Sequence, residues 1–338
     1  MHFAFDDDQL ALSGAVAGLL EKRAGLDTLR RAWAHPGAPA VWAVWDELAA
    51  MGVHGLLAPE TAGGSDLDWV TMALVLAEAG RAALPLPLLE TAAVGIPLVA
   101  RAGDPLGILP SLVDGSAVLT VSGGTGPGSP VPASSRADWF LIDGALHHRE
   151  EVDITPVRSV DRTRDTATVV ARHAGCPVGD AGDAGALATA AVLIGLGRAL
   201  VRMTVDYVKE RRQFGVPVGS FQAVKHQLAD ATMQVEFAAP TVWSAAWEMS
   251  HPELVDADRT RRSVSLAKAA ASTAAERVAR TALQCHGAMG YTDDYHLHMW
   301  LKRVWCLAPS FGTARRHRIR LGRQLGLPVG CPQEERSA

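Results

Sequence analysis

Four side chains between residues 207 and 230 have the chemistry to hold an anion next to a flat ring. They are Arg211, Gln213, Phe214 and Gln222. The guanidinium of Arg211 is a planar fork that suits a pyrophosphate, and Phe214 offers a ring face close by in the sequence. Gly215 and Pro217 interrupt a helical pattern and leave backbone N–H groups free. The spacing therefore predicts a ligand-binding turn between two helices.

The charges at the start of this turn have a simpler interpretation. Taken alone, Lys209, Glu210 and the two arginines after them are typical of a solvated helix end. The ring, the amides and the Gly/Pro break that follow favour binding. A second turn, QCHGAMGY at residues 284–291, strengthens that interpretation, because its small residues let the backbone approach a ligand closely.

Other chemistries lack their residue patterns in this sequence. His286, His296 and His298 match no spacing of a metal-ligand set, so no metal is expected. The glycines at 195 and 197 lie in a helical pattern without the third glycine of a dinucleotide fingerprint, which favours close helix packing. The run GGTGPGS from residue 123 lacks the Lys–Ser/Thr ending of a phosphate loop and is interpreted as a linker.

The composition predicts a globular protein of the cytoplasm. Its 338 residues suffice for two or three domains, and a net charge of −4 gives no reason to expect nucleic acid or an anionic membrane as a partner. The four cysteines lie far apart, as unpaired thiols in a reducing compartment do. The first residues are acidic where a signal peptide is basic. The apolar run 184–200 is interrupted by Arg198, so a buried helix is expected rather than a membrane span.

Apolar spacing divides the chain into three parts. Residues 1–112 carry helical patterns, for example at 6–23 and 88–102, which predict an all-helical domain. Residues 113–180 contain four short runs rich in β-branched and aromatic residues, which predict a small β domain. These runs are 117–122, 139–143, 152–160 and 167–173. The spacing is helical again over 181–330 and indicates a bundle, so the expected fold class is mainly α with a small β domain.

Two motifs give the chain a resemblance to a known family. The pattern R-x-Q-F-G-x-P-x-x-x-F-Q-A-x-x-H-x-L-A-D from Arg211, followed by Q-x-x-G-x-x-G-Y from Gln284, is similar to the acyl-CoA dehydrogenases. The opening FDDDQLAL, the loop GLLAPETAGG, the segment RAALPLP and residues 161–164 also resemble family positions, so the likeness covers nearly the whole chain. It implies an N-terminal helical domain, a middle β domain and a C-terminal four-helix bundle.

The resemblance also implies a reaction. Family members bind FAD and oxidise the Cα–Cβ bond of acyl-CoA thioesters. A glutamate removes the α-proton, the β-hydrogen leaves as hydride to the flavin, and hydrogen bonds to the thioester oxygen stabilise the enolate-like charge. An electron-transfer flavoprotein is the expected electron acceptor.

Three departures from the family pattern concern catalysis. The middle domain is a few dozen residues short, and the T-E-P-x-x-G-S-D and W-I-T segments, which hold the flavin within one subunit, have no counterpart. The usual base stands in a Y-E-G-T segment, where this chain has Phe311. Some members carry the base on the helix before Q-x-x-G-x-x-G, and that position is Thr273 here. Glu276 is the only carboxylate nearby, and a structural, solvated role is its favoured interpretation.

The pattern of losses resembles the short subunit of heteromeric acyl-CoA dehydrogenases known from bacterial steroid side-chain degradation. In the family each FAD lies at a subunit interface, and this chain keeps the segments that reach a neighbour's flavin. The resemblance implies a non-catalytic subunit in an α2β2 assembly with a full-length partner, which supplies the flavin pocket and the glutamate. The implied substrate is a bulky steroid side-chain CoA ester. The residues assigned to FAD contacts are Arg211, Gln213, Phe214, Phe221, Gln222, Gln284, Gly287 and Thr313.

Two alternatives stay open at this point. One is a homo-oligomeric acyl-CoA dehydrogenase that uses Glu276 as an atypical base. The other is a redox-inert protein that binds acyl-CoA or acts as a scaffold. Flavin bound by the chain alone would favour the first, and the absence of flavin in every pairing would favour the second.

Overall fold

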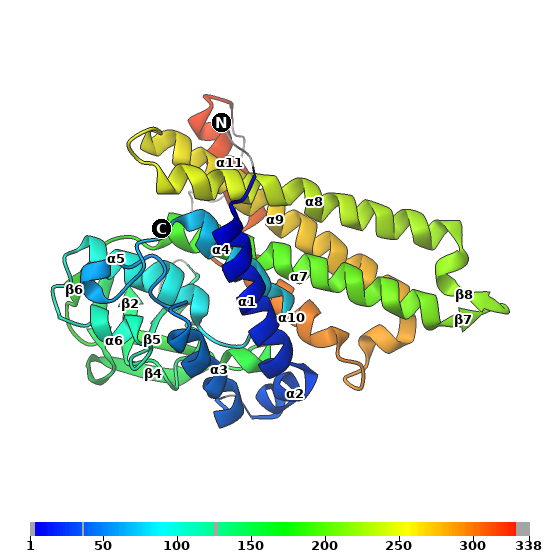
Figure 1. The fold of residues 1–338 in the computed structure, drawn as a ribbon, viewed down its shortest axis with the longest axis horizontal. Helices are drawn as coiled ribbons and strands as arrows, with labels where there is room; N and C mark the ends of the chain where they lie inside the picture. The colour runs from blue at the N-terminus through cyan, green and yellow to red at the C-terminus, as the bar shows by residue number, and fades with distance from the viewer. Residues whose placement is uncertain (1–3, 36, 125–127, 329–338) are drawn as a thin grey trace.

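Helices come first along the chain, short strands follow, and long helices complete it (Figure 1). The structure is a computed structural model and describes residues 4–35, 37–124 and 128–328. The prediction of a mainly helical fold with small sheets is confirmed. The domain boundaries after residues 112 and 180 stay predictions.

Acidic side chains cap two of the N-terminal helices. The elements are α1 (Asp7–Arg23), α2 (Leu26–Ala34), α3 (Pro39–Ala50), α4 (Trp69–Arg81), a π-helix (Leu89–Gly95), α5 (Ile96–Arg101) and α6 (Leu109–Val113). Before α1, the Asp6 carboxylate accepts from the Gln9 N–H at 2.7 Å, and the Asp6 N–H donates to Gln9 Oε1 at 3.2 Å. Asp68 accepts from the Thr71 N–H at the start of α4. These caps fix where both helices begin.

The segment predicted as one helix at 88–102 is split in two. Its first part is the π-helix, and α5 begins at Ile96. Pro97 has no N–H to bond the carbonyl four residues earlier, so the regular α pattern is broken near this point. The Thr91 hydroxyl donates to Leu119 O at 2.6 Å, which ties the π-helix to the first strand.

Two small sheets make up the β region. β1 (Leu119–Val121), β2 (Trp139–Ile142), β3 (Ala145–His148) and β6 (Cys176–Pro177) form one sheet in the order β1-β2-β3-β6. β1 and β2 are parallel, and the other pairs are antiparallel. β4 (Val152–Pro156) and β5 (Ala167–Ala171) form the second sheet. The four predicted strands are present, while β3 and β6 were not predicted.

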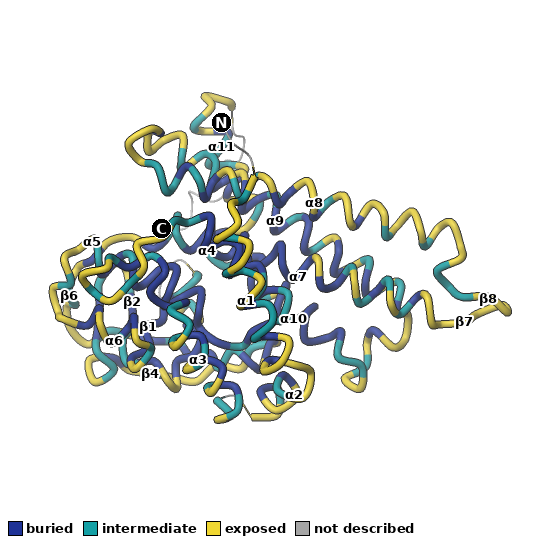
Figure 2. The backbone as a smooth tube through the Cα atoms, viewed as in Figure 1, coloured by how far each residue is buried: buried dark blue, intermediate teal, exposed yellow. Residues whose placement is uncertain are grey.

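The long helices pack into a bundle. They are α7 (Gly182–Glu210), α8 (Gln222–Ser250), α9 (Ala257–His286), α10 (Leu297–Leu307) and α11 (Ala314–Gln324). With 29 or 30 residues each, α7, α8 and α9 are about 45 Å long. α7 is buried throughout residues 185–197 and has an exposed face beyond them (Figure 2). Its length and composition would suit a membrane span, but 83% of its most apolar stretch is buried inside the protein.

α4 and α7 touch at glycines. A Cβ on Gly195 would lie 1.8 Å from Ala77 O, and a Cβ on Gly80 would lie 2.1 Å from Val192 O. No side chain fits at either point, so the helix backbones are in direct contact. The close helix packing predicted for residues 195–197 is therefore confirmed at its first glycine.

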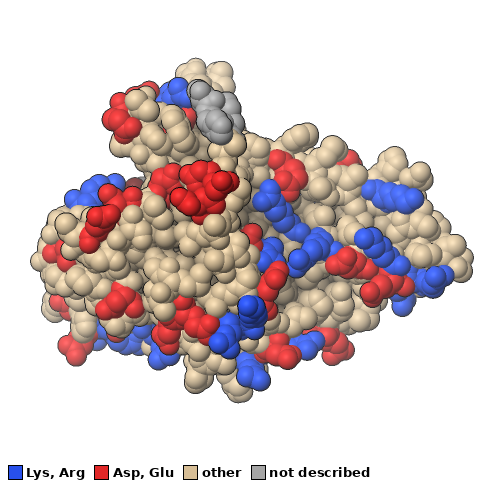
Figure 3. Space-filling model, viewed as in Figure 1, with Lys and Arg blue, Asp and Glu red and all other residues tan. Residues whose placement is uncertain are grey.

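Acidic and basic side chains are interspersed along the arm formed by α7 and α8 (Figure 3). Some of them pair directly, as Arg198 of α7 does with Glu236 of α8 at 2.7 Å. This face of the molecule therefore lacks the single-sign field that attracts nucleic acid.

Candidate cofactor-contacting site

A tight hairpin joins α7 to α8 at the tip of the bundle, at the opposite end of the molecule from the two sheets (Figure 1). Arg211 follows α7 in an extended conformation, and its carbonyl accepts from the Val218 N–H at 2.7 Å. β7 (Arg212–Gln213) then pairs with β8 (Val216–Pro217) across a two-residue turn. The structure thus places a short, hydrogen-bonded turn where the sequence predicts one.

The two turn residues, Phe214 and Gly215, have positive φ angles of 51° and 81°. Positive φ at both central positions is the pattern of a type I′ turn, which glycine adopts easily and phenylalanine does not. The Phe214 side chain is nevertheless 91% exposed, so burial of its ring within this chain does not offset the strain. A strained and exposed aromatic residue favours a contact outside the chain.

Groups that can bind a ligand lie close in sequence to this ring. Phe221 lies edge-on to Phe214, with the ring centroids 6.3 Å apart. Phe221 also directly precedes α8, and its side chain does not cap the helix. The first N–H groups of α8 therefore donate no hydrogen bond to the side chain at the cap position. Arg211, Gln213 and Gln222 are exposed in the same turn. A cation, side-chain amides and the positive end of a long helix together suit an anion.

The end of α9 lies beside this turn. The Tyr207 ring, in the last turn of α7, stacks on His286 with the centroids 4.2 Å apart, and its hydroxyl donates to His286 O at 3.4 Å. Gln284 is exposed in the last turn of α9, and Gly287 ends the helix with φ 58°. The structure therefore brings Gln284 and Gly287 to the same end of the bundle as Arg211.

Thr313 lies elsewhere. It caps α11, where its hydroxyl oxygen accepts from the Arg316 N–H at 3.2 Å. It directly follows Gly312, whose carbonyl accepts from Lys268 of α9. Gln284 is more than four helical turns further along α9 than Lys268, or about 24 Å. Within one chain, Thr313 therefore does not join the other seven predicted contacts.

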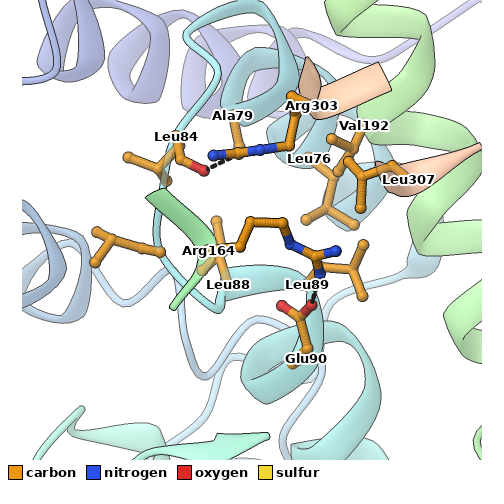
Figure 4. Close-up of a pocket in the computed structure, with 11 residues that line it drawn as sticks. Leu76, Ala79, Leu84, Leu88, Leu89, Glu90, Arg164, Val192, Arg303 and Leu307 are labelled. Carbon is orange, nitrogen blue, oxygen red and sulfur yellow. Dashed lines mark hydrogen bonds and ion pairs between the residues drawn. The ribbon is translucent and has the colours of Figure 1, made fainter. Parts of the chain in front are cut away.

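A small cavity lies between α4, the π-helix, α7 and α10 (Figure 4). Its volume is about 40 Å³, whereas a small-molecule pocket measures roughly 300–1,000 Å³. It has room for a few water molecules and not for an acyl thioester. One wall carries an ion pair between Arg164 and Glu90 at 2.9 Å. The lining residues are Leu76, Ala79, Leu84, Leu86, Leu88, Leu89, Glu90, Arg164, Val192, Arg303 and Leu307.

Arg303 of α10 joins three parts of the chain beside this cavity. Its Nε pairs with the Asp161 carboxylate, its Nη2 donates to Thr163 Oγ1 at 2.6 Å, and its Nη1 donates to Leu84 O at 2.7 Å. Burial alone would raise the pKa of Asp161, but the charge of Arg303 and the hydrogen bond from Thr163 lower it below its usual value. The family-like residues 161–164 therefore bind the β region to the helices.

Aromatic rings surround the three histidines that the sequence analysis considered as metal ligands. His286 stacks on Tyr207, His298 packs edge-on to Trp33 and His296 packs edge-on to Trp300. Within the described ranges, no three His, Cys, Asp or Glu side chains are grouped so that they could hold a metal ion.

Comparison with known proteins identifies the family. Residues 6–106 match the N-terminal domain of the acyl-CoA dehydrogenases, and residues 182–326 match their C-terminal domain. Acyl-CoA dehydrogenase IpdE2 of Mycobacterium tuberculosis is 31% identical over 304 residues, which cover 88% of this chain and 91% of the relative. The chain belongs to the acyl-CoA dehydrogenase family. Members of this family typically bind FAD.

Two solved structures extend the likeness over the middle of the chain. A chain of the ChsE4–ChsE5 complex from Mycobacterium tuberculosis superposes with a TM-score of 0.85 at 24% identity and covers 98% of this chain and 100% of its own length. A chain of the Tcur3481–Tcur3483 steroid ACAD gives a TM-score of 0.82 at 25% identity, with coverages of 95% and 98%. The β region is therefore part of the family fold as well.

Neither position that the resemblance assigns to the catalytic base carries an ionisable side chain. Phe311 packs its ring directly on α7, where a Cβ on Gly185 would lie 2.2 Å from the ring carbons Cδ1 and Cε1. The hydroxyl of Thr273 donates to the backbone of α9 at 2.8 Å and accepts from an arginine of α11 at 2.6 Å. Glu276 is half-buried on α9, and its charge acts on Lys268. Sequence reasoning did not single out Lys268, Arg303 or the stacking of Tyr207.

Proposed function

We propose that this chain is a non-catalytic subunit of an FAD-dependent acyl-CoA dehydrogenase, in which a full-length partner subunit provides the flavin pocket and the catalytic glutamate. The observation that carries the proposal is the hairpin. Phe214 is exposed at a strained turn beside Arg211, at the opposite end of the molecule from the chain's own sheets. Ligand-binding groups that point away from their own subunit suit a cofactor held by a neighbour.

The hairpin residues fit the adenosine diphosphate part of FAD. Arg211 and the first N–H groups of α8 suit the pyrophosphate. The ring of Phe214 and the amides of Gln213 and Gln222 suit the adenosine side, to which Phe221, Gln284 and Gly287 also belong. We assign Thr313 to a separate contact, because it lies away from this group.

The other half of a flavin site does not fit the residues of this chain. The 40 Å³ cavity is too small for a flavin ring or a thioester, and Phe311 fills the space against Gly185 with a side chain that takes no proton. Bound FAD supplies the hydride acceptor for the reaction. The residues of this chain bind and orient its phosphates and adenosine, and proton abstraction belongs to the partner.

We extend the proposal to partner, substrate and compartment by analogy with relatives. The similar ChsE4–ChsE5 structure is a complex, and the Tcur3481–Tcur3483 structure is described as a steroid ACAD. An α2β2 assembly that oxidises a steroid side-chain CoA ester and passes electrons to an electron-transfer flavoprotein in the cytoplasm follows from that analogy.

The chain purified alone is expected to be colourless, and co-expression with a full-length partner is expected to yield a flavin-containing complex that oxidises acyl-CoA. Flavin absorbance and dye-linked activity measure both results. A yellow, active homo-oligomer would contradict the proposal, and loss of its activity in Glu276→Gln would identify the base. A complex that never binds flavin would instead indicate a scaffold.

Arg211→Ala is expected to weaken FAD binding by the complex roughly tenfold or more, because a hydrogen bond between charged groups is worth about 1.5–3 kcal/mol. The thermal midpoint of the chain alone should not change, since Arg211 is exposed. Arg212→Ala, one residue further in the same hairpin, is the matched control and should keep its flavin. If both variants kept the flavin content of the wild-type complex, Arg211 would not belong to the site.

A further inference from the structure

The turn that joins α10 to α11, residues 308–313, has an unusual backbone. Phe311 and Gly312 both have positive φ angles, 53° and 103°. The Phe311 N–H donates to Gly123 O, which brings the loop after β1 onto this turn. A phenylalanine with positive φ is strained, so its surroundings must hold it in place.

A wholly buried amine lies under this turn. Lys268 Nζ of α9 donates to Ala308 O at 2.8 Å, to Gly312 O at 3.0 Å and to Ser272 Oγ at 2.9 Å. An ammonium has three N–H donors, so all of them are used. A neutral amine keeps both carbonyl bonds and can accept from the Ser272 hydroxyl, so this site is satisfied in either protonation state.

Two of these partners, Ala308 O and Gly312 O, belong to the turn, and the amine links them. Ala308 is the residue after α10, where helix carbonyls lack intrahelical partners. Gly312 O lies on the far side of Phe311 and accepts no other hydrogen bond among those of the described residues than the one from Lys268. The amine therefore spans the strained residue from both sides.

We propose that Lys268 is the positioning residue of the 308–313 turn. Its amine holds the backbone of Phe311 in the left-handed conformation, keeps the ring seated on Gly185, and sets the position of Thr313, the residue that caps α11. The space beside Gly123 and Gly185 stays closed as a result. The role of Thr313 as an FAD contact rests on the proposed function, whereas the control of the turn by Lys268 does not.

The titratable and charged groups around the amine determine how the stability of the protein should depend on pH. Burial lowers the pKa of Lys268 to about 7, and Glu276 on the same helix partly opposes that shift. On α11, His317 has a pKa lowered to about 4 by burial and bonds to Phe311 O at 2.9 Å. Beyond it, Arg320 of α11 pairs with Asp183 of α7 at 2.7 Å.

The sign of the pH effect follows from these values. The ordinary pKa of a lysine is 10.5, so between about pH 7 and 10.5 the unfolded chain binds more protons than the folded one. Stability from this group therefore increases as the pH rises, by about tenfold in the ratio of folded to unfolded protein per pH unit. The penalty for burying the charge is fully present below pH 7.

Hydrogen–deuterium exchange on the full chain tests the proposal. In Lys268→Met the Phe311 and Gly312 amides should exchange roughly tenfold faster or more, while amides in the middle of α8 keep their wild-type rates. Unchanged exchange at the turn, or an equal increase everywhere, would overturn it. If Lys268→Met does not fold, Ser272→Ala keeps the amine but removes one partner, and faster exchange confined to the same amides is expected.

A pH series separates positioning by an ionisable group from simple packing. From about pH 7.5 to 9.5, wild type should become more stable relative to Lys268→Met. The ratio of folded to unfolded protein should rise by nearly tenfold per pH unit in wild type compared with the variant. A difference that does not vary with pH would overturn the assignment. None of these measurements involves flavin, so failure here and failure of the proposed function are distinguishable.

Discussion

Arg303→Met is expected to lower the free energy of unfolding by about 3–5 kcal/mol, because it leaves a buried carboxylate without its cation. Asp161 is only 1% exposed, and without Arg303 its nearest remaining partner is Thr163, which cannot balance a charge. Leu84 O also loses its hydrogen bond. Denaturant unfolding at neutral pH measures the change.

Two further variants make this expectation specific. Arg162→Met removes the exposed arginine of the same turn, which lies over the Trp33 ring, and should cost at most about 1 kcal/mol. Arg303→Met combined with Asp161→Leu removes both charges and should recover much of the lost stability. A cost below about 1 kcal/mol for Arg303→Met alone would show that the pair adds little to the fold.

The helices were predictable because their signals are local. Three acidic residues mark the start of α1, with Asp6 as the cap and the next two in the first turn. The two strands of the β region that prediction missed have weak local signals. β3 has the sequence ALHH, without β-branched residues, and β6 has only two residues. The Asp143–Gly144 turn before β3, with both φ angles positive, is a hairpin signal that would have revealed it.

The candidate site was predictable only in part, for a physical reason. The motif from Arg211 is continuous in sequence, so its turn was recognisable. The contact that brings Gln284 beside it, Tyr207 stacked on His286, joins residues 79 positions apart. Lys268 was not recognised because a single lysine among alanines is typical of an exposed helix position, and its acceptors lie 40 and 44 positions away. Such contacts depend on packing that no local pattern encodes.

Gly195→Ala is expected to be more disruptive than any exposed substitution in this chain. The new Cβ would lie 1.8 Å from Ala77 O and 2.8 Å from Arg81 N, both backbone atoms of α4. A backbone cannot rotate away as a side chain does, so α4 and α7 must separate. Overpacking typically costs about 1–3 kcal/mol, and the direct backbone clash places this variant at the upper end of that range or beyond. Denaturant unfolding and the yield of folded protein measure the effect.

Gly18→Ala, in the interior of α1, is the matched control for this substitution. A Cβ there meets nothing within 4 Å, so the same chemical change should raise stability by about 0.5–1 kcal/mol through the better helix propensity of alanine. If stability falls in Gly195→Ala and rises in Gly18→Ala, the loss at Gly195 comes from the close approach of α4 and not from helix propensity. A neutral Gly195→Ala would mean that the two helices can separate freely. The N-terminal helices would then not be held to the bundle at this contact.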